Sequence, residues 1–373
     1  MLYNIKKQKT EGRQRMNENY LLHNETAKKL YFEYAKDLPI IALCSKYEPS
    51  DKIYNNIAEA FLLNDFYKLA AMRDCGIDEK FITGNASDYE KFKAFCSALP
   101  KFAGHPLYLL SHIELQKHFE CSLPICEDNC DLIWQDANAK ISTNLISEKI
   151  LLEKNNIKYY SSLYLSWVDE LYSNKDIVDL SALENALVNR INNADKNGCR
   201  IAFYPAFSDF VTPNPYLANE IVKRARTKDF IEIEDFDFLN MQIIRDLGIE
   251  YKKLGWTWLL QGNHIDDEAI EYLEKNNALP KIKSYIQFEI GESEEHLELQ
   301  LMGYASKYPI GNLICTVNTA DNLLSCARND YFRRIVCNII GKWVENGEYT
   351  TDEKTLKKLI EDILYNNLKE AIT

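Results

Sequence analysis

Between residues 145 and 320, short apolar runs alternate with longer stretches of helical character. Five such runs look like buried strands: 158–165, 200–207, 256–261, 281–290 and 312–319. An earlier apolar run, Ile40 to Cys44, is a sixth candidate. Strands that alternate with helices build βα units around a parallel sheet, so the pattern predicts an α/β fold. A closed (β/α)₈ barrel needs eight strands, two more than the sequence offers.

Helical patterns occupy the rest of the chain. Asn24 is the expected N-cap of a first helix that Pro39 ends. The segment 50–145 has helical character throughout and no repeat of fixed period. The last fifty residues show a helical stripe of apolar residues, Leu356, Leu359, Ile360, Ile363, Leu364 and Leu368, which indicates core packing.

The charge and the cysteines restrict the class of protein. The formal net charge is −12, which argues against nucleic acid as a partner because phosphate binding needs clustered positive charge. No apolar run is long enough for a membrane span. Ten cysteines without paired spacing, and no secretory signal, predict reduced thiols in the cytoplasm. The basic segment 1–16 is expected to be disordered, and translation could start at Met1 or Met16.

Common catalytic motifs are missing from the sequence. It contains no GxGxxG, Walker, HExxH or GxSxG pattern, and its six histidines lack metal-type spacing. Cys121, Cys126 and Cys130 cluster, but no CxxC-type pair or fourth ligand completes a zinc site.

Four long segments resemble uronate isomerases. They are YLLHNETAKKLYFEYAKDLPII (20–41), YKLAAMRDCGIDEKFITGNASDYEKFKAF (67–95), GHPLYLLSHIELQKHF (104–119) and RNDYFRRIVCNIIGKWVENGEY (328–349). The resemblance implies a distorted TIM barrel of the amidohydrolase type, here shortened and incomplete, with a large helical insertion after strand 1 and C-terminal helices. The family interconverts the aldose and ketose forms of D-glucuronate or D-galacturonate, usually with a divalent metal such as zinc.

The resemblance also suggests the division of the chain. Residues 17–373 are expected to form a single domain. Its helical insertion is predicted over 50–145, its barrel over 38–48 and 146–330, and its C-terminal helices over 331–373.

The family's metal ligands are absent from the matching positions. Its PIIDxHxH motif falls on Pro39 to Lys46, so the aspartate is Ala42 and the two histidines are Cys44 and Lys46. Gln261 replaces a later histidine, and Thr319 replaces the aspartate of the TDSR motif. A lysine ammonium in a ligand position repels a dication. We therefore expect no bound metal and no other cofactor.

Most of the family's substrate positions have changed as well. Tyr67 keeps the tyrosine of the DHYKWR motif, but the histidine and arginine are lost. The arginine of FRPD is Ser208 and that of TDSR is Asp321. The family-site positions that remain as candidates are thus Tyr67, Ser208, Gln261 and Asp321. Tyr67 could line a pocket, although packing on a helix is the more ordinary role for such an aromatic residue.

Two functions follow as expectations. The first is a non-catalytic relative with a binding or regulatory role, able to bind a sugar acid or to join a homo- or hetero-oligomer. The alternative is an active isomerase with a rearranged or metal-free site, in which Lys46 acts with Asp209 or Asp321. A soft-metal site of Cys44 with Cys315 or Cys326 is a further possibility, but free cysteines on strands are usually small buried apolar residues.

Overall fold

A computed structural model of the chain describes residues 17–44, 50–204, 210–228, 230–261, 267–317 and 326–373. The predicted basic extension therefore lies outside the described residues. Within them, six parallel strands form one sheet in the order of the sequence: β1 (Ile40–Cys44), β2 (Ile157–Tyr164), β3 (Ile201–Tyr204), β4 (Thr257–Gln261), β5 (Lys281–Phe288) and β6 (Ile314–Val317). All six predicted strands are confirmed.

The sheet has the sequential strand order of a barrel but does not close. Among the described residues, β1 and β6 are the two edges and do not pair with each other. The strands are staggered: Ile157 to Ser161 of β2 pair with β1, whereas Ser162 to Tyr164 pair with β3. Strands that are tilted to the axis of a barrel show this stagger between neighbours, which is called shear. The expected incomplete barrel of α/β class is therefore what the chain forms.

Successive side chains of the strands pack on opposite faces. Trp258 and Leu260 of β4 pack outward against helices, while Leu259 between them packs inward. The inner face is filled by the end of the chain, where Leu368 and Ile372 pack against the inward residues of β1, β3, β4, β5 and β6. The C-terminus thus closes the inside of the open sheet.

Among the described residues, six α-helices lie between β1 and β2, in the segment expected to be helical: α3 (Ile57–Phe61), α4 (Phe66–Asp74), α5 (Asp88–Ala98), α6 (Pro106–Phe119), α7 (Cys130–Asn144) and α8 (Glu148–Lys154). Helices α3–α7 share their own apolar core. Asn56, Asp65 and Ser87 cap α3, α4 and α5 through their side chains, as short polar residues at N-caps do.

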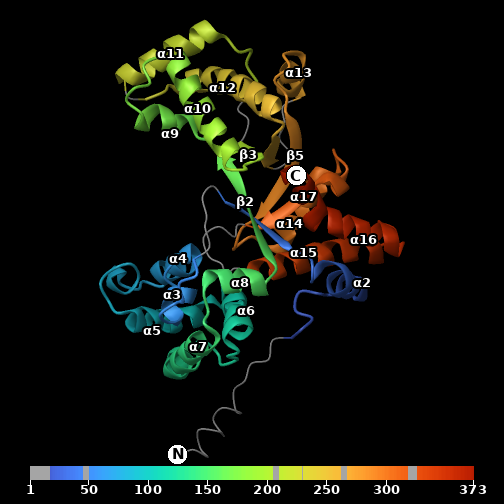
Figure 1. Cartoon of the computed structure of the whole chain (residues 1–373). Coiled ribbons are helices and arrows are strands. Elements are labelled where there is room, and N and C mark those ends of the chain that lie inside the picture. The colour runs from blue at the N-terminus through green and yellow to red at the C-terminus, as the bar shows by residue number, and fades with distance from the viewer. Residues whose placement is uncertain (1–16, 45–49, 205–209, 229, 262–266, 318–325) are drawn as a thin grey trace, which may run out of the picture.

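Helices connect the later strands. They are α9 (Trp167–Ser173), α10 (Leu180–Lys196), α11 (Pro215–Lys228), α12 (Ile233–Leu254), α13 (Asp267–Lys275) and α14 (Glu294–Ala305). Helices α9–α12 form a group well separated from the insertion helices (Figure 1). The helical character expected between the strands is thus confirmed. Helix α11 buries a helical stripe at Ala218, Ile221, Val222 and Ala225.

The two ends of the chain pack together. At the start lie α2 (Glu25–Lys29), capped by Asn24 as predicted, and a π-helix (Leu30–Ala35). At the end lie α15 (Cys326–Glu345), α16 (Glu353–Glu361), a π-helix (Asp362–Asn366) and α17 (Asn367–Ile372). Gly341 of α15 lets α2 approach closely, because a Cβ there would stand 2.7 Å from Asn24 Oδ1. In the part of the chain that is described, no helix is both long and apolar enough to cross a bilayer.

Candidate functional site

Two of the positions predicted from the sequence are the last residues of described strands. Gln261 is the last residue of β4 and is exposed. Cys44 is the last residue of β1 and stands in register with Ser161 of β2. The remaining predicted residues, Lys46, Ser208, Thr319 and Asp321, together with Asp209, lie outside the described residues. Their convergence at the sheet end stays a prediction.

Tyr67 joins the insertion to the end of β5. It is half-buried on the first turn of α4, and its hydroxyl donates a hydrogen bond to Glu289, the residue after β5. Gln287 Nε2 donates to the other oxygen of the same carboxylate over 2.7 Å. The guanidinium of Arg328 lies 4.7 Å from the centre of the Tyr67 ring. Tyr67 is therefore held by a carboxylate, a cation and the helix, so it both packs and takes part in a polar network.

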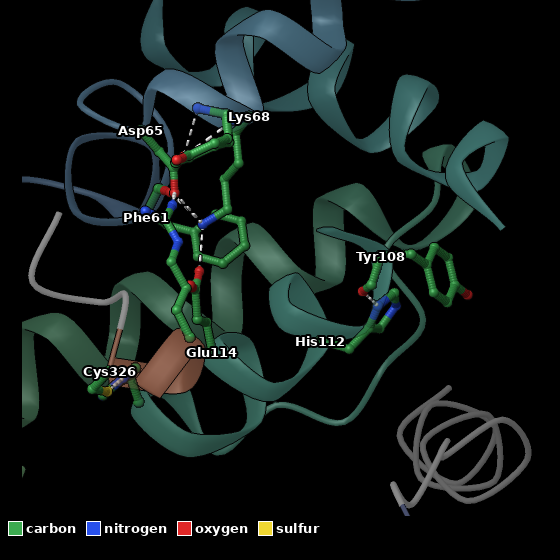
Figure 2. A network of polar contacts seen from close by, with 10 residues as sticks. Phe61, Asp65, Lys68, Tyr108, His112, Glu114 and Cys326 are labelled. Carbon is green, nitrogen blue, oxygen red and sulfur yellow. Dashed lines mark hydrogen bonds and ion pairs between the residues drawn. The ribbon is translucent and has the colours of Figure 1, made fainter. Parts of the chain in front are cut away.

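A buried cluster of four charged side chains lies behind Tyr67. Asp65 Oδ2 accepts from Arg328 over 2.7 Å and stands 3.3 Å from Lys68 Nζ. Lys68 also pairs with Glu114, and it donates to the carbonyl of Phe61 over 2.9 Å (Figure 2). Every one of the four is at most 4% exposed. We call Asp65, Lys68, Glu114 and Arg328 the buried quartet.

Local sequence and tertiary packing both position the quartet. Asp65 caps α4, because its Oδ1 accepts from the backbone N–H groups of Tyr67 and Lys68 at 3.0 and 3.1 Å. Lys68 follows three residues later on the same helix face. Glu114 comes from α6, and Arg328 comes from the start of α15, 263 residues away from Asp65. The quartet thus ties the insertion to the C-terminal helices.

Burial and charge act differently on the two acids. Burial raises the pKa of Glu114 above its usual value, against the attraction of Lys68. Burial also opposes ionisation of Asp65, but the Lys68 ammonium and the Arg328 guanidinium together hold its pKa below the usual range. Asp65 is therefore held ionised between the two cations, whereas burial works against the ionised form of Glu114.

Other candidate ligands do not assemble into a metal centre. Ala42 is fully buried on β1 and offers no donor atom where the family has an aspartate. Cys315 is buried on β6, and burial raises the pKa of its thiol to about 12, which disfavours the thiolate that metals bind. No group of three or more His, Cys, Asp or Glu side chains could hold a metal ion within the ranges that the structure describes. By the chemistry of its donors, the replaced set does not fit a divalent metal.

Comparison with known proteins identifies the family. The sequence model of the family described as Glucuronate isomerase matches residues 13–163 and 281–371. The chain belongs to the glucuronate isomerase family. A uronate isomerase of Caldanaerobacter subterraneus subsp. tengcongensis is 30% identical over 458 aligned positions, which cover 95% of this chain and 98% of the relative. One of Caldicellulosiruptor bescii is 29% identical with the same coverage.

Solved structures of the glucuronate isomerase family share the fold. The crystal structure of uronate isomerase from Thermotoga maritima superposes with a TM-score of 0.79 at 20% identity, covering 96% of this chain and all of the other. Glucuronate isomerase from Caulobacter crescentus gives a TM-score of 0.80 at 15% identity, covering 96% and 97%. The resemblance stated from the sequence is confirmed.

The middle of the chain departs most from the glucuronate isomerase family. The family model passes over residues 164–280, which contain β3, β4 and helices α9–α13. The alignment to the Caldanaerobacter relative is also longer than the 373 residues of this chain, so segments of the relative have no counterpart here. Between β3 and β4 the described chain supplies only α11 and α12. The described residues thus form six strands, where a closed (β/α)₈ barrel has eight.

Sequence reasoning missed the buried quartet and Glu289. Lys68 and Glu114 lie within segments that resemble the family, Asp65 lies two residues before one of them, and Arg328 begins another. Their pairing, however, joins residues that are far apart in the chain, and nothing in a local pattern shows it.

Proposed function

We propose that this chain is a non-catalytic member of the glucuronate isomerase family with a binding or regulatory role. The observation that carries the proposal is the replaced ligand set: Ala42, Cys44, Lys46 and Thr319 occupy the positions that match the family's metal ligands. Of these, Ala42 is fully buried and has no polar side-chain atom. Lys46 adds a positive charge where a dication would bind.

The retained residues support a structural use of the old site. The Tyr67 hydroxyl donates a hydrogen bond to Glu289, so this donor is already used within the protein. The side chains of the buried quartet likewise form ion pairs with one another. Moving a proton between C2 and C1 of a sugar needs a base and an oxyanion stabiliser that face the substrate. Family membership suggests a sugar acid as the ligand, which the protein would bind without turnover. Alternatively, the protein would act as a partner in an oligomer and bind no sugar acid.

An isomerase assay separates this proposal from its alternative. Purified full-length protein is incubated with D-glucuronate or D-galacturonate, with and without zinc or manganese, and its metal content is measured in parallel. The Thermotoga maritima enzyme serves as the positive control. The proposal expects no turnover and no stoichiometric metal. Turnover by the wild type would overturn the proposal. If that turnover falls in Lys46→Ala, the result would favour a metal-free site that uses Lys46.

A further inference from the structure

A cavity of about 510 Å³ opens beside the segments that lead into β1 and β2. One wall is the connection from the first π-helix to β1, at Lys36 and Asp37. A second is the turn before β2, at Lys154 and Asn155. Helices α6 and α15 complete it. Its size is in the range of small-molecule sites. Of the candidate residues that are described, Cys326 lines it, whereas Tyr67 and Gln261 do not.

The cavity is positively charged in an acidic protein. Five cations line it, namely Lys36, Lys117, Lys154, Arg333 and Arg334, against two acids, Asp37 and Asp330. The chain as a whole carries a net charge of −12. Side chains of one charge that line a concave surface produce a strong local electric field. Here the field is positive and attracts anions.

Asp330 does not neutralise the cavity, because its carboxylate is already used. Arg334 Nε donates to it over 3.0 Å, and the hydroxyls of Tyr20 and Tyr31 both donate to it as well. Arg334 is thereby balanced. Apart from Asp330, the lining contains one further acid, Asp37.

Arg333 is a buried cation that forms no ion pair with an acid in the described part of the chain. Its side chain lines the cavity and is 4% exposed. Its guanidinium donates to the backbone carbonyls of Leu38 and Pro39 at 2.8 Å each, and to those of Ala35 and Lys36. Carbonyls satisfy N–H groups but do not cancel a charge, and burial lowers the pKa of Arg333 to about 10. An anion in the cavity would supply the missing charge.

Three lysines surround Arg333 from separate elements. Lys36 precedes β1, Lys117 is on α6 and Lys154 ends α8, and all three are exposed. In the described chain, no ion pair joins any of them to an acid, although many other lysines of the protein are paired. The three lysines therefore bring their charges to one hollow from three separate elements.

From this arrangement we infer that the cavity binds a small phosphate-bearing anion. Lysine ammonium groups act as point charges toward phosphate, whereas a single carboxylate is better matched by one arginine fork. Several cations with one free acid also favour a ligand of two or more negative charges over a singly charged sugar acid. The site is distinct from the strand ends, so the inference stands whether or not the protein is an isomerase.

Isothermal titration of the full-length protein with inorganic pyrophosphate tests the inference, with inorganic phosphate and D-glucuronate titrated in parallel. We expect saturable binding of one pyrophosphate per chain, weaker binding of phosphate, and still weaker binding of glucuronate. The affinity should fall as ionic strength rises. In Lys117→Gln/Lys154→Gln the affinity should fall by at least about tenfold, because two charges that face the ligand are lost. Lys36→Gln tests a different wall of the cavity.

Lys196→Gln is the matched control. Lys196 is an exposed lysine at the end of α10, outside the cavity, and its loss should leave pyrophosphate binding unchanged. Far-ultraviolet circular dichroism confirms that each variant is folded. An absence of binding by the wild type would overturn the inference. So would equal affinity in Lys36→Gln, the double variant and the wild type, or equal losses in the control and the cavity variants.

Discussion

Arg328 donates a hydrogen bond to Asp65 over 2.7 Å, and the two side chains are 4% and 0% exposed. This contact joins α15 to α4 across 263 residues of sequence. Because both charges are out of water, each depends on the other for compensation. The pair therefore holds the insertion against the C-terminal helices at the place where Tyr67 reaches Glu289.

Breaking this pair should destabilise the protein strongly. Arg328→Met leaves Asp65 buried with one fewer cation, and we expect the free energy of unfolding to fall by about 3–5 kcal/mol. The control is Arg73→Met, which breaks the exposed pair with Glu79 and should have a much smaller effect, because solvent screens that pair. Urea unfolding measures both. A loss in Arg328→Met no larger than in the control would show that the pair does not stabilise the fold.

The acid pair between α10 and α12 should make stability depend on pH. Burial, with the hydrogen bond to Asp246, raises the pKa of Glu184 to about 7. The folded protein then keeps a proton that the unfolded chain releases, so this contribution to stability is present below pH 4.5 and is lost as pH rises toward 7. Glu184→Gln should abolish that decline.

Unfolding free energies measured across this pH range check the Glu184 prediction. Glu274→Gln removes an exposed acid of α13 and should leave the decline as it is in the wild type. Parallel curves for Glu184→Gln and the wild type would contradict the assignment to Glu184.

Helix α17 at the C-terminus should contribute strongly to stability, because it covers the inner face of the open sheet. Leu368 is 5% exposed and packs in the cluster with the inward strand residues. Leu368→Ala should lower the free energy of unfolding by about 2–5 kcal/mol, whereas Lys369→Ala on the exposed side should stay within about 0.5 kcal/mol of the wild type. Thermal and urea unfolding distinguish the two. Equal, small effects would mean that the end of the chain does not contribute to the core.

Gly341 should be intolerant of any side chain. A Cβ there would stand 2.7 Å from Asn24 Oδ1 and 2.8 Å from the backbone N of Ala27, which forces α2 away from α15. Gly341→Ala should therefore cost about 1–3 kcal/mol despite the better helix propensity of alanine. Gly311→Ala is the control, because its added Cβ would meet only Leu359 at an ordinary 3.8 Å. A stabilised Gly341→Ala protein would contradict this packing.

The sequence predicted the sheet well for a physical reason. Each strand is a short apolar run next to a helix with a clear stripe or cap, as at Ile40 to Cys44 and at Asn24. Helix α9 is only seven residues long, and α11 begins at Pro215 after polar residues, so neither gave a strong signal. The hydrophobic pattern of a sequence indicates a helix or strand more clearly when that element is long or strongly periodic.

The candidate site was harder to predict than the fold. Tyr67 could be named because it lies in a recognisable segment, but its partner Glu289 lies 222 residues away. The unpaired cations around Arg333 likewise come from elements spread along the chain. Such groupings depend on tertiary packing, which local periodicity does not encode. The replaced ligands, by contrast, are visible in the sequence alone, and they carry the proposal of lost catalysis.

The most direct test of that proposal is proton exchange at C2 of D-glucuronate. The full-length protein and the Thermotoga maritima enzyme are each incubated with glucuronate and zinc in deuterated water, and the C2 proton is followed by NMR. The measurement detects proton removal even where net isomerisation is slow. If the protein is non-catalytic, we expect no deuterium at C2 and no 2-keto isomer, whereas the control enzyme should convert the sugar fully. Deuterium incorporation above the protein-free rate would contradict the proposal.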